Sequence, residues 1–175
     1  RQRARLRRIN CTTTFRAFRI HHDAAGQLAG LGERTTAALT PGEVLVKVAY
    51  SSVNYKDALA GTGKGRILRT YQLNGGIDLA GHVAASADPK FREGDAVLCT
   101  GSGLSETRDG GYAEYARLDA RWVIPLPPGL SLRESMILGT AGFTAALALY
   151  RMRDNRQTPN LGPLVQREQE ENEPH

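Results

Sequence analysis

The sequence predicts a mainly β protein with some α structure: a small open β-barrel, then two helices, then the first strand of an α/β sheet. Nineteen glycines and eight prolines are spread along the 175 residues, which indicates many turns and short strands. Strand-like periodicity continues to about residue 127, and helix signals follow it. The hydrophobic fraction of 41% and the charged fraction of 23% are typical of a soluble globular protein. This length is sufficient for one well-packed domain.

Short segments with strand periodicity account for most of the chain before residue 127. Between residues 44 and 50, valines and a tyrosine alternate with other residues, so they share one face of a strand. Within the strand predicted at 75–86, Gly81 indicates a bulge or a close approach of another backbone. Residues 22–40 are expected to form a loop, and 54–66 a short helical turn that ends in glycines. The other predicted strands are 15–21, 91–101, 110–118 and 121–127.

Helix signals begin after the Pro-Pro-Gly turn at 127–129. Ser131 and Glu134 have the spacing of a capping box, which predicts a helix over 132–138. A second helix is predicted over 139–152, where apolar residues lie almost all round and indicate burial. Residues 161–165 then have the composition of a buried strand.

The two ends of the chain are expected to be disordered. Five arginines fall within the first eight residues and account for the net charge of +5. A basic arm that binds nucleic acid is one interpretation of residues 1–14, and a disordered extension is the one we favour. Residues 166–175 form a polar tail of the same kind. No apolar run reaches membrane-spanning length, and no apolar core of a secretory signal follows the N-terminal charges.

The cysteines and histidines predict neither a disulfide nor a metal site. Cys11 and Cys99 have no paired spacing, which fits a reducing cytoplasm. Cys99 lies in a strand pattern and is expected to be a buried structural thiol. His21 and His22 are adjacent on a strand and point to opposite faces, while His82 has no ligand at a matching spacing.

Two glycine clusters resemble phosphate loops without completing one. The cluster at 61–66, "GTGKGR", lacks the first glycine and the hydroxyl residue of a P-loop. The cluster at 101–106, "GSGLSE", has Glu106 where a dinucleotide-binding loop has its third glycine. The 175 residues therefore contain no complete G-x-G-x-x-G.

Five polar residues are candidates for a site. Asn54 and Tyr55 follow a buried strand, where their side chains could face a cleft. Alternatively, Tyr55 closes the barrel beside a solvated ion pair between Lys56 and Asp57. Asp78 stands between apolar residues, so it is either a structural hydrogen-bonding centre or a tuned functional group. Thr140 and Thr144 lie at the head of the second helix, which indicates either ligand binding or close helix packing.

Several longer motifs occur together in one order and resemble a known family. They include "YSSVNYKDALAGTGKGRILR", "GGIDLAGHV", "FREGDAVL", "RDGGYAEYARL", "WVIPLPPGLS" and "LGTAGFTAALAL", and span roughly residues 15 to 162. Over this range the chain resembles the N-terminal, GroES-like catalytic domain of a medium-chain dehydrogenase/reductase. It is most similar to the zinc-independent acryloyl-CoA reductase group, which is often named with the quinone oxidoreductases.

The resemblance implies an activity, a cofactor and roles for the candidate residues. Such enzymes use NADPH to reduce the activated double bond of an acryloyl-type thioester, or a quinone. Zinc-dependent relatives have a cysteine where this chain has "VNYKD" and a histidine where it has Ile77. By resemblance, Tyr55 contacts the nicotinamide end and is a candidate proton donor, Asn54 orients substrate or cofactor, and Asp78 is a hydrogen-bond partner at the cleft. Thr140 and Thr144 would line the cofactor crevice.

The resemblance also sets the expected domain organisation. It implies a GroES-like domain at 15–138 and, at 139–165, a helix and the start of a Rossmann cofactor domain. Because a polar tail follows Val165, we expect the chain to lack the rest of that domain and to be inactive alone. The expected partner is a small-molecule thioester or quinone substrate, with no nucleic-acid or membrane partner. Full-length relatives are expected to be homo-oligomers. The alternatives are a ligand-binding module without catalysis and a nucleic-acid binder with a basic tail.

Overall fold

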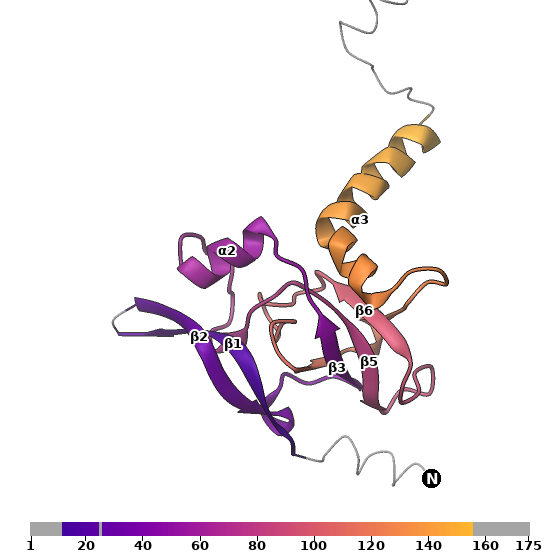
Figure 1. Cartoon of the computed structure of the whole chain (residues 1–175). Coiled ribbons are helices and arrows are strands. Elements are labelled where there is room, and N and C mark those ends of the chain that lie inside the picture. The colour runs from indigo at the N-terminus through magenta and orange to yellow at the C-terminus, as the bar shows by residue number, and fades with distance from the viewer. Residues whose placement is uncertain (1–11, 25, 156–175) are drawn as a thin grey trace, which may run out of the picture. The chain divides into compact units, whose positions relative to one another are not determined.

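The computed structural model describes residues 12–24 and 26–155, which form two antiparallel sheets and a few helices (Figure 1). The chain divides into two compact units, Arg1–Ala141 and Gly142–His175. The strands are β1 (Thr14–Asp23), β2 (Gly26–Thr35), β3 (Val44–Tyr50), β4 (Leu73–Asn74), β5 (Asp78–Ser86), β6 (Ala96–Thr100), β7 (Tyr115–Leu118) and β8 (Ile124–Pro125). The helices are η1 (Thr36–Ala38), α2 (Tyr55–Thr62), η2 (Ala120–Trp122) and α3 (Leu132–Asp154).

A five-stranded sheet in the order β7-β3-β5-β6-β8 forms the larger part of the first unit. Its core contains Val44, Val46, Leu79 and Val97, all fully buried. The strands predicted from periodicity at 44–50, 75–86 and 91–101 are confirmed as β3, β5 and β6. The close approach predicted at Gly81 is also confirmed, because a Cβ there would lie 2.1 Å from the Lys47 carbonyl oxygen of β3. A side chain at that position would push the two strands apart.

A three-stranded sheet in the order β2-β1-β4 completes the first unit. β1 and β2 form a hairpin of ten residue pairs, from Thr14 opposite Thr35 to Asp23 opposite Gly26. The prediction of a loop over 22–40 is therefore wrong for β2. This strand has two internal glycines and exposed leucines at 28 and 31, so backbone pairing with β1 stabilises it where side-chain periodicity does not.

The two predicted helical segments at 132–138 and 139–152 are both present, joined within α3. The capping box is confirmed, since Ser131 N–H donates to Glu134 Oε2 at 2.9 Å and Glu134 N–H donates to Ser131 Oγ at 3.2 Å. Gly139 interrupts the helix with φ 51° and ψ −158°. The short helix predicted at 54–66 is confirmed as α2, which ends at Gly63 in a left-handed conformation.

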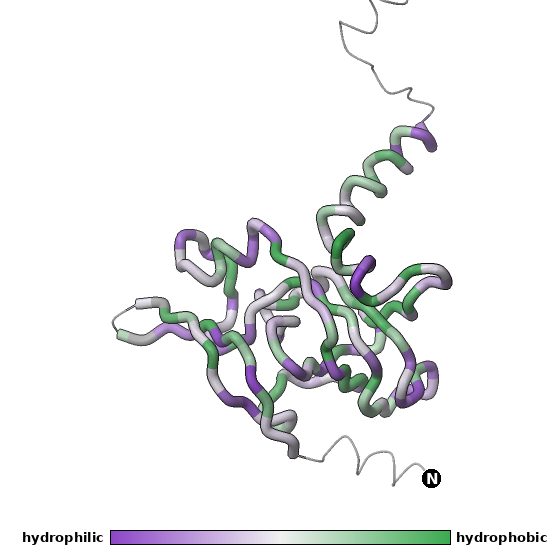
Figure 2. Tube along the Cα trace, in the orientation of Figure 1, coloured by the Kyte–Doolittle hydropathy of each residue, from purple (hydrophilic) through white to green (hydrophobic). Residues whose placement is uncertain are grey.

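The predicted burial of the second helical segment is wrong for the residues described. Phe143, Leu149 and Tyr150 are 60%, 62% and 64% exposed. Figure 2 shows this part of α3 coloured mainly as hydrophobic before it ends in hydrophilic residues. A single helix with apolar residues on all sides can bury them only under a covering layer. No described helix is long and apolar enough to cross a membrane.

The remaining predictions for this part of the chain concern Cys99 and the ends. Cys99 is fully buried, as predicted, and burial raises the pKa of its thiol to about 12. The thiol is therefore unreactive at neutral pH. The strand predicted at 161–165, Cys11, and the extensions at 1–11 and 166–175 lie outside the described residues.

Candidate functional site

The side chain of Asp78 is the centre of a buried hydrogen-bond cluster. Asp78 begins β5 and is fully buried. Its Oδ1 accepts a hydrogen bond from Thr140 Oγ1 at 2.5 Å, and its Oδ2 accepts one from Ser52 Oγ at 2.5 Å. Oδ2 also accepts from Asn54 Nδ2 and from the Thr140 backbone N–H, both at 2.9 Å. These four residues, Ser52, Asn54, Asp78 and Thr140, are called the Asp78 cluster below. Both carboxylate oxygens are thus engaged, as a buried carboxylate requires.

Gly139 allows the helical backbone to reach this cluster. Its φ of 51° lies in the left-handed region, which glycine adopts without steric cost. A Cβ at this position would lie 2.9 Å from both Asp78 Oδ2 and Ser52 Oγ. The interruption of α3 and the absence of a side chain therefore both serve the contact between Asp78 and Thr140.

A second buried carboxylate, Asp57, continues the network toward α2. Its Oδ2 accepts a hydrogen bond from the Asn54 backbone N–H, and its Oδ1 accepts one from the Ile77 N–H, both at 2.9 Å. The Asn54 amide also reaches Asp57 Oδ2 at 3.3 Å. Asn54 thereby joins both carboxylates and fixes the start of α2. The Lys56–Asp57 pair of one sequence-based interpretation is not formed; Lys56 Nζ instead donates to Glu106 at 2.7 Å.

The structure presents Tyr55 at the edge of this network. Tyr55 is the first residue of α2 and follows directly on Asn54. Its side chain is 80% exposed, so the ring is open to a ligand. Of the five residues predicted for the site, Asn54, Asp78 and Thr140 lie together and Tyr55 adjoins them in the chain. Thr144 lies in the second compact unit and is exposed.

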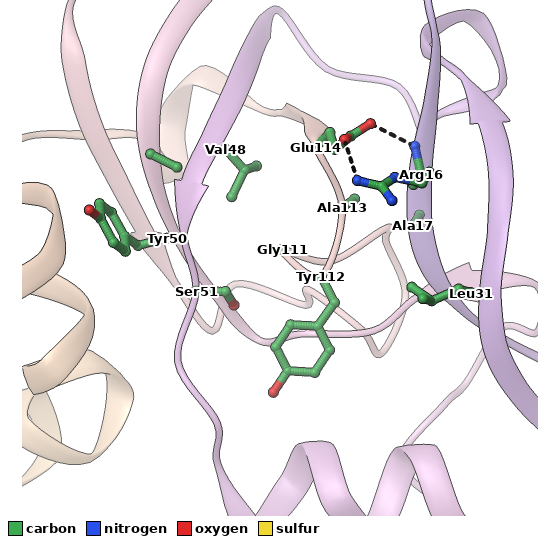
Figure 3. A pocket seen from close by; sticks show the side chains of 11 residues that line it. Arg16, Ala17, Leu31, Val48, Tyr50, Ser51, Gly111, Tyr112, Ala113 and Glu114 are labelled. Carbon is green, nitrogen blue, oxygen red and sulfur yellow. Dashed lines mark hydrogen bonds and ion pairs between the residues drawn. The ribbon is translucent and has the colours of Figure 1, made fainter.

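A cavity of about 400 Å³ lies within the first unit, between the β1–β2 hairpin and β3 (Figure 3). Leu31, Val48, Ser51 and Tyr112 are among its lining residues, and an ion pair between Arg16 and Glu114 at 3.5 Å also borders it. The volume is within the range of small-molecule pockets, roughly 300–1,000 Å³. The five predicted site residues do not line it.

Tyr112 and Ser51 connect this cavity with the Asp78 cluster. The Tyr112 hydroxyl donates to the Ser52 carbonyl oxygen at 3.0 Å, and Ser51 Oγ donates to the Asp78 carbonyl oxygen at 2.5 Å. Burial, and then the negative charge of Asp57, raise the pKa of Tyr112 well above its usual value of 10.0. Tyr112 therefore remains a hydrogen-bond donor throughout the physiological pH range.

Sequence reasoning did not identify Ser52, Asp57 or Tyr112 as parts of this network. Their partners are distant in the chain, since Tyr112 bonds a residue 60 positions away and Asp57 bonds one 20 positions away. The one available local signal was the Asn54–Asp57 spacing of a helix cap. Within the described residues, no group of three or more histidine, cysteine or acidic side chains could hold a metal ion.

Comparisons with known proteins agree on one family. Residues 40–128 match the alcohol dehydrogenase GroES-like domain. The chain is 46% identical over 138 residues to the probable acrylyl-CoA reductase AcuI of Escherichia coli, covering 79% of this chain and 43% of that protein. The crystal structure of the yhdH oxidoreductase of Salmonella enterica in complex with NADP is 47% identical, with a TM-score of 0.77, and the match covers 79% of this chain and 43% of that one.

A third relative gives the same result. The crystal structure of Bacillus subtilis yhfP with NAD bound is 46% identical, with a TM-score of 0.79, and the match covers 86% of this chain and 46% of that one. The chain thus spans less than half the length of each of these three relatives. The predicted fold class, a mainly β GroES-like domain followed by helices, is confirmed. The chain belongs to the alcohol dehydrogenase GroES-like family and, with it, to the medium-chain dehydrogenases/reductases.

Proposed function

We propose that this chain supplies the substrate end of the active site of an NADPH-dependent reductase, which acts on the activated double bond of an acryloyl-type thioester. The Asp78 cluster carries the proposal, because it fixes the segment that ends in the exposed Tyr55. The similarity to a protein named acrylyl-CoA reductase and to a structure with bound NADP supports the substrate and cofactor. A quinone substrate is the nearest alternative within the same family.

The residues around Tyr55 suit the nicotinamide end of the cofactor. NADPH supplies the hydride when it is bound. The Tyr55 ring, 80% exposed, offers an aromatic face for stacking and a hydroxyl group for hydrogen bonding. Thr140 and Thr144 are proposed to line the crevice, with Thr140 held through both its backbone N–H and its hydroxyl by Asp78.

Asn54 and Asp78 are proposed as positioning residues for this chemistry. The Asn54 amide N–H groups point to Asp57 and Asp78, and both Asp78 oxygens accept hydrogen bonds. These groups hold the backbone before Tyr55 in one geometry. Precise positioning of reacting groups lowers the activation barrier, because the orientation is fixed before the reaction begins.

Tyr55 is proposed to donate the proton. Reduction of the double bond adds a hydride at the β-carbon and a proton at the α-carbon of the thioester. A phenol within hydrogen-bond reach can also stabilise the negative charge that develops on the carbonyl oxygen. A proton returns to Tyr55 from water through its exposed face.

We further propose that turnover needs a Rossmann domain in addition to the residues described. In the family such a domain holds the pyrophosphate of the cofactor at a glycine-rich loop, and the 175 residues contain no complete loop of that kind. The second candidate function, a binding module without catalysis, is favoured by the cavity of about 400 Å³ that the first unit forms by itself.

A chimera tests the catalytic role of Tyr55. Residues 12–155 replace the corresponding part of the Salmonella enterica oxidoreductase, and NADPH oxidation is followed with acryloyl-CoA. In the Tyr55→Phe chimera we expect kcat to fall by about 10²–10⁴. Tyr71→Phe is the matched control, because Tyr71 is also exposed, at 43%, and should leave kcat unchanged. Unchanged turnover in Tyr55→Phe would remove the proton-donor role.

The binding-module alternative is separated by titrating the 175-residue chain itself. Acryloyl-CoA is added first without NADPH, and then NADPH is added. Saturable thioester binding with no oxidation of NADPH, in the chain and in the chimera alike, would favour a binding module over a reductase.

A further inference from the structure

A second cavity, of about 380 Å³, lies on the β1–β2 hairpin beside η1. It is lined by Thr14, Arg19, Glu33, Arg34, Thr35 and Ala38. Every one of these residues belongs to the first compact unit. The cavity shares no lining residue with the one in Figure 3 and none with the Asp78 cluster.

The register of the hairpin brings the two arginines to one face. Arg34 is opposite Phe15, and Arg19 is opposite Gly30. Because side chains two and four residues apart in a strand point to the same side, Arg19 lies on the face of Phe15 and therefore of Arg34.

The side chain of Arg19 lies beside Gly32 of β2. A Cβ at Gly30 would meet nothing within 4 Å, and one at Gly32 would meet only Arg19 Cδ, at 3.6 Å. The aliphatic stem of Arg19 therefore passes over Gly32 in the direction of Arg34.

Both guanidinium groups keep donors that the protein does not use. The Nε atoms of Arg19 and Arg34 are buried and have no hydrogen-bond partner within the part of the chain that the structure describes. Arg34 Nη2 donates to the Ala38 carbonyl oxygen at 2.8 Å, and the side chain is 16% exposed. Burial, and then the positive charge of Arg34, lower the pKa of Arg19, so the two cations lie close enough to repel.

Two acidic residues bear on the charge of this cavity. Asp109 is fully buried, lies 3.6 Å from Arg34 Nη2, and accepts hydrogen bonds from the Thr40 and Asn74 backbone N–H groups. Its charge offsets that of one arginine. Glu33 is exposed, so solvent screens its carboxylate. Within the described residues, the half-buried guanidinium of Arg19 therefore has no acidic partner at ion-pair distance, and two buried Nε donors are unpaired.

We propose that Arg19 and Arg34 form a binding site for a phosphate-type oxyanion, either inorganic phosphate or the terminal phosphate of an organic monoester. The planar forks of two guanidinium groups match the oxygens of such an anion, and charge-assisted hydrogen bonds to it are among the strongest in proteins. Thr14 and Thr35 line the same cavity. The site is independent of the proposed reduction.

The test is a titration of the full chain with inorganic phosphate in a phosphate-free buffer, followed by the ¹H–¹⁵N resonances of the arginine Nε–H groups. We expect saturable shifts of Arg19 and Arg34. Arg19→Gln should weaken binding about ten-fold, since a charge-assisted hydrogen bond is lost. The matched control Arg92→Gln, which removes an exposed arginine from the β5–β6 turn, should leave the affinity unchanged.

A second variant is expected to change the phosphate affinity in the opposite direction, which a loss of folding could not do. Glu33→Gln removes a negative charge from the cavity and should tighten phosphate binding, by about two-fold for an exposed charge. Adenosine monophosphate is the second probe. Tighter binding of this nucleotide than of phosphate assigns the site to monoesters, and equal binding assigns it to the inorganic ion.

Two results would overturn the proposal. One is the absence of saturable shifts for the wild-type chain with either probe up to tens of millimolar. The other is an equal loss of affinity in Arg19→Gln and Arg92→Gln, which would make the binding a response to net charge alone.

Discussion

Asp78 and Asp109 are both fully buried aspartates, and their surroundings differ in kind. Asp78 accepts hydrogen bonds from two hydroxyls, one amide and one backbone N–H. Asp109 accepts them from the backbone N–H groups of Thr40 and Asn74 and has the Arg34 guanidinium at 3.6 Å. Both carboxylates are thus satisfied, one by neutral donors alone and the other by backbone groups beside a cation.

We propose that the difference separates a functional network from a structural one. The partners of Asp78 are the side chains that precede Tyr55 and the residue that follows the interruption at Gly139. The partners of Asp109 are backbone groups of β4 and of the segment after η1, together with the β2 residue Arg34. A buried aspartate in the sequence is therefore not evidence for an active site; the residues it holds decide which role it has.

The largest effect is expected from removing the charge of Asp78. In Asp78→Asn, an amide N–H replaces an oxygen that accepts hydrogen bonds, so buried donors of Ser52 or Thr140 lose their acceptor. We expect the free energy of unfolding in urea to fall by about 3 kcal/mol or more. Asp154→Asn, at a residue whose side chain is 57% exposed, is the control and should change it by less than about 0.5 kcal/mol. Equal changes in the free energy of unfolding of the two variants would contradict a stabilising role for the hydrogen bonds of the Asp78 cluster.

A smaller effect is expected from closing the backbone approach at Gly139. Gly139→Ala introduces a Cβ at 2.9 Å from Asp78 Oδ2 and strains the positive φ of this residue. We expect a loss of about 1–3 kcal/mol in the free energy of unfolding. Gly129→Ala is the matched control, because Gly129 also has a positive φ, of 82°, but open space at its Cβ. If Gly139→Ala loses no more free energy of unfolding than Gly129→Ala, the close approach of residue 139 to Asp78 does not require the absence of a side chain.

Local patterns in the sequence predicted much of this arrangement. Alternation identified β3, β5 and β6, and the Ser131–Glu134 spacing identified the start of α3. β2 was missed because its stability comes from pairing with β1, which no pattern within β2 shows. Asp78 was recognised as anomalous among apolar neighbours, but its partners were not, because Thr140 is 62 residues away and Ser52 is 26. The fold alone brings these residues together.

The smallest predicted effect concerns an ion-pair cluster outside both networks. Glu106 accepts a hydrogen bond from Lys56 at 2.7 Å and pairs with Arg69 at 2.8 Å. The hydrogen bond from Lys56, and then the charges of Lys56 and Arg69, lower the pKa of Glu106 below its usual value of 4.5, against a smaller opposing effect of burial. Its stabilisation is therefore complete above the unfolded pKa and is lost as the pH falls through the lower folded pKa.

The pH dependence of one variant checks this prediction. The free energy of unfolding of Glu106→Gln is compared with that of the wild type near pH 7 and at about pH 3. We expect the difference between the two proteins to shrink as the pH falls, because the stabilisation by the Glu106 carboxylate is lost as the pH approaches and passes its lowered pKa. A difference that is constant with pH would mean that the charge of Glu106 contributes no stability.

The most direct test of the functional role of the Asp78 cluster compares Asp78→Asn with Asp109→Asn in the chimera with the Salmonella enterica oxidoreductase. NADPH oxidation with acryloyl-CoA is measured for both, and kcat is corrected for the folded fraction of each protein. The account predicts that Asp78→Asn lowers kcat by about 10² through misplacement of Tyr55, while Asp109→Asn leaves it within about two-fold. Equal values of kcat for the two variants would contradict a functional role for the Asp78 cluster.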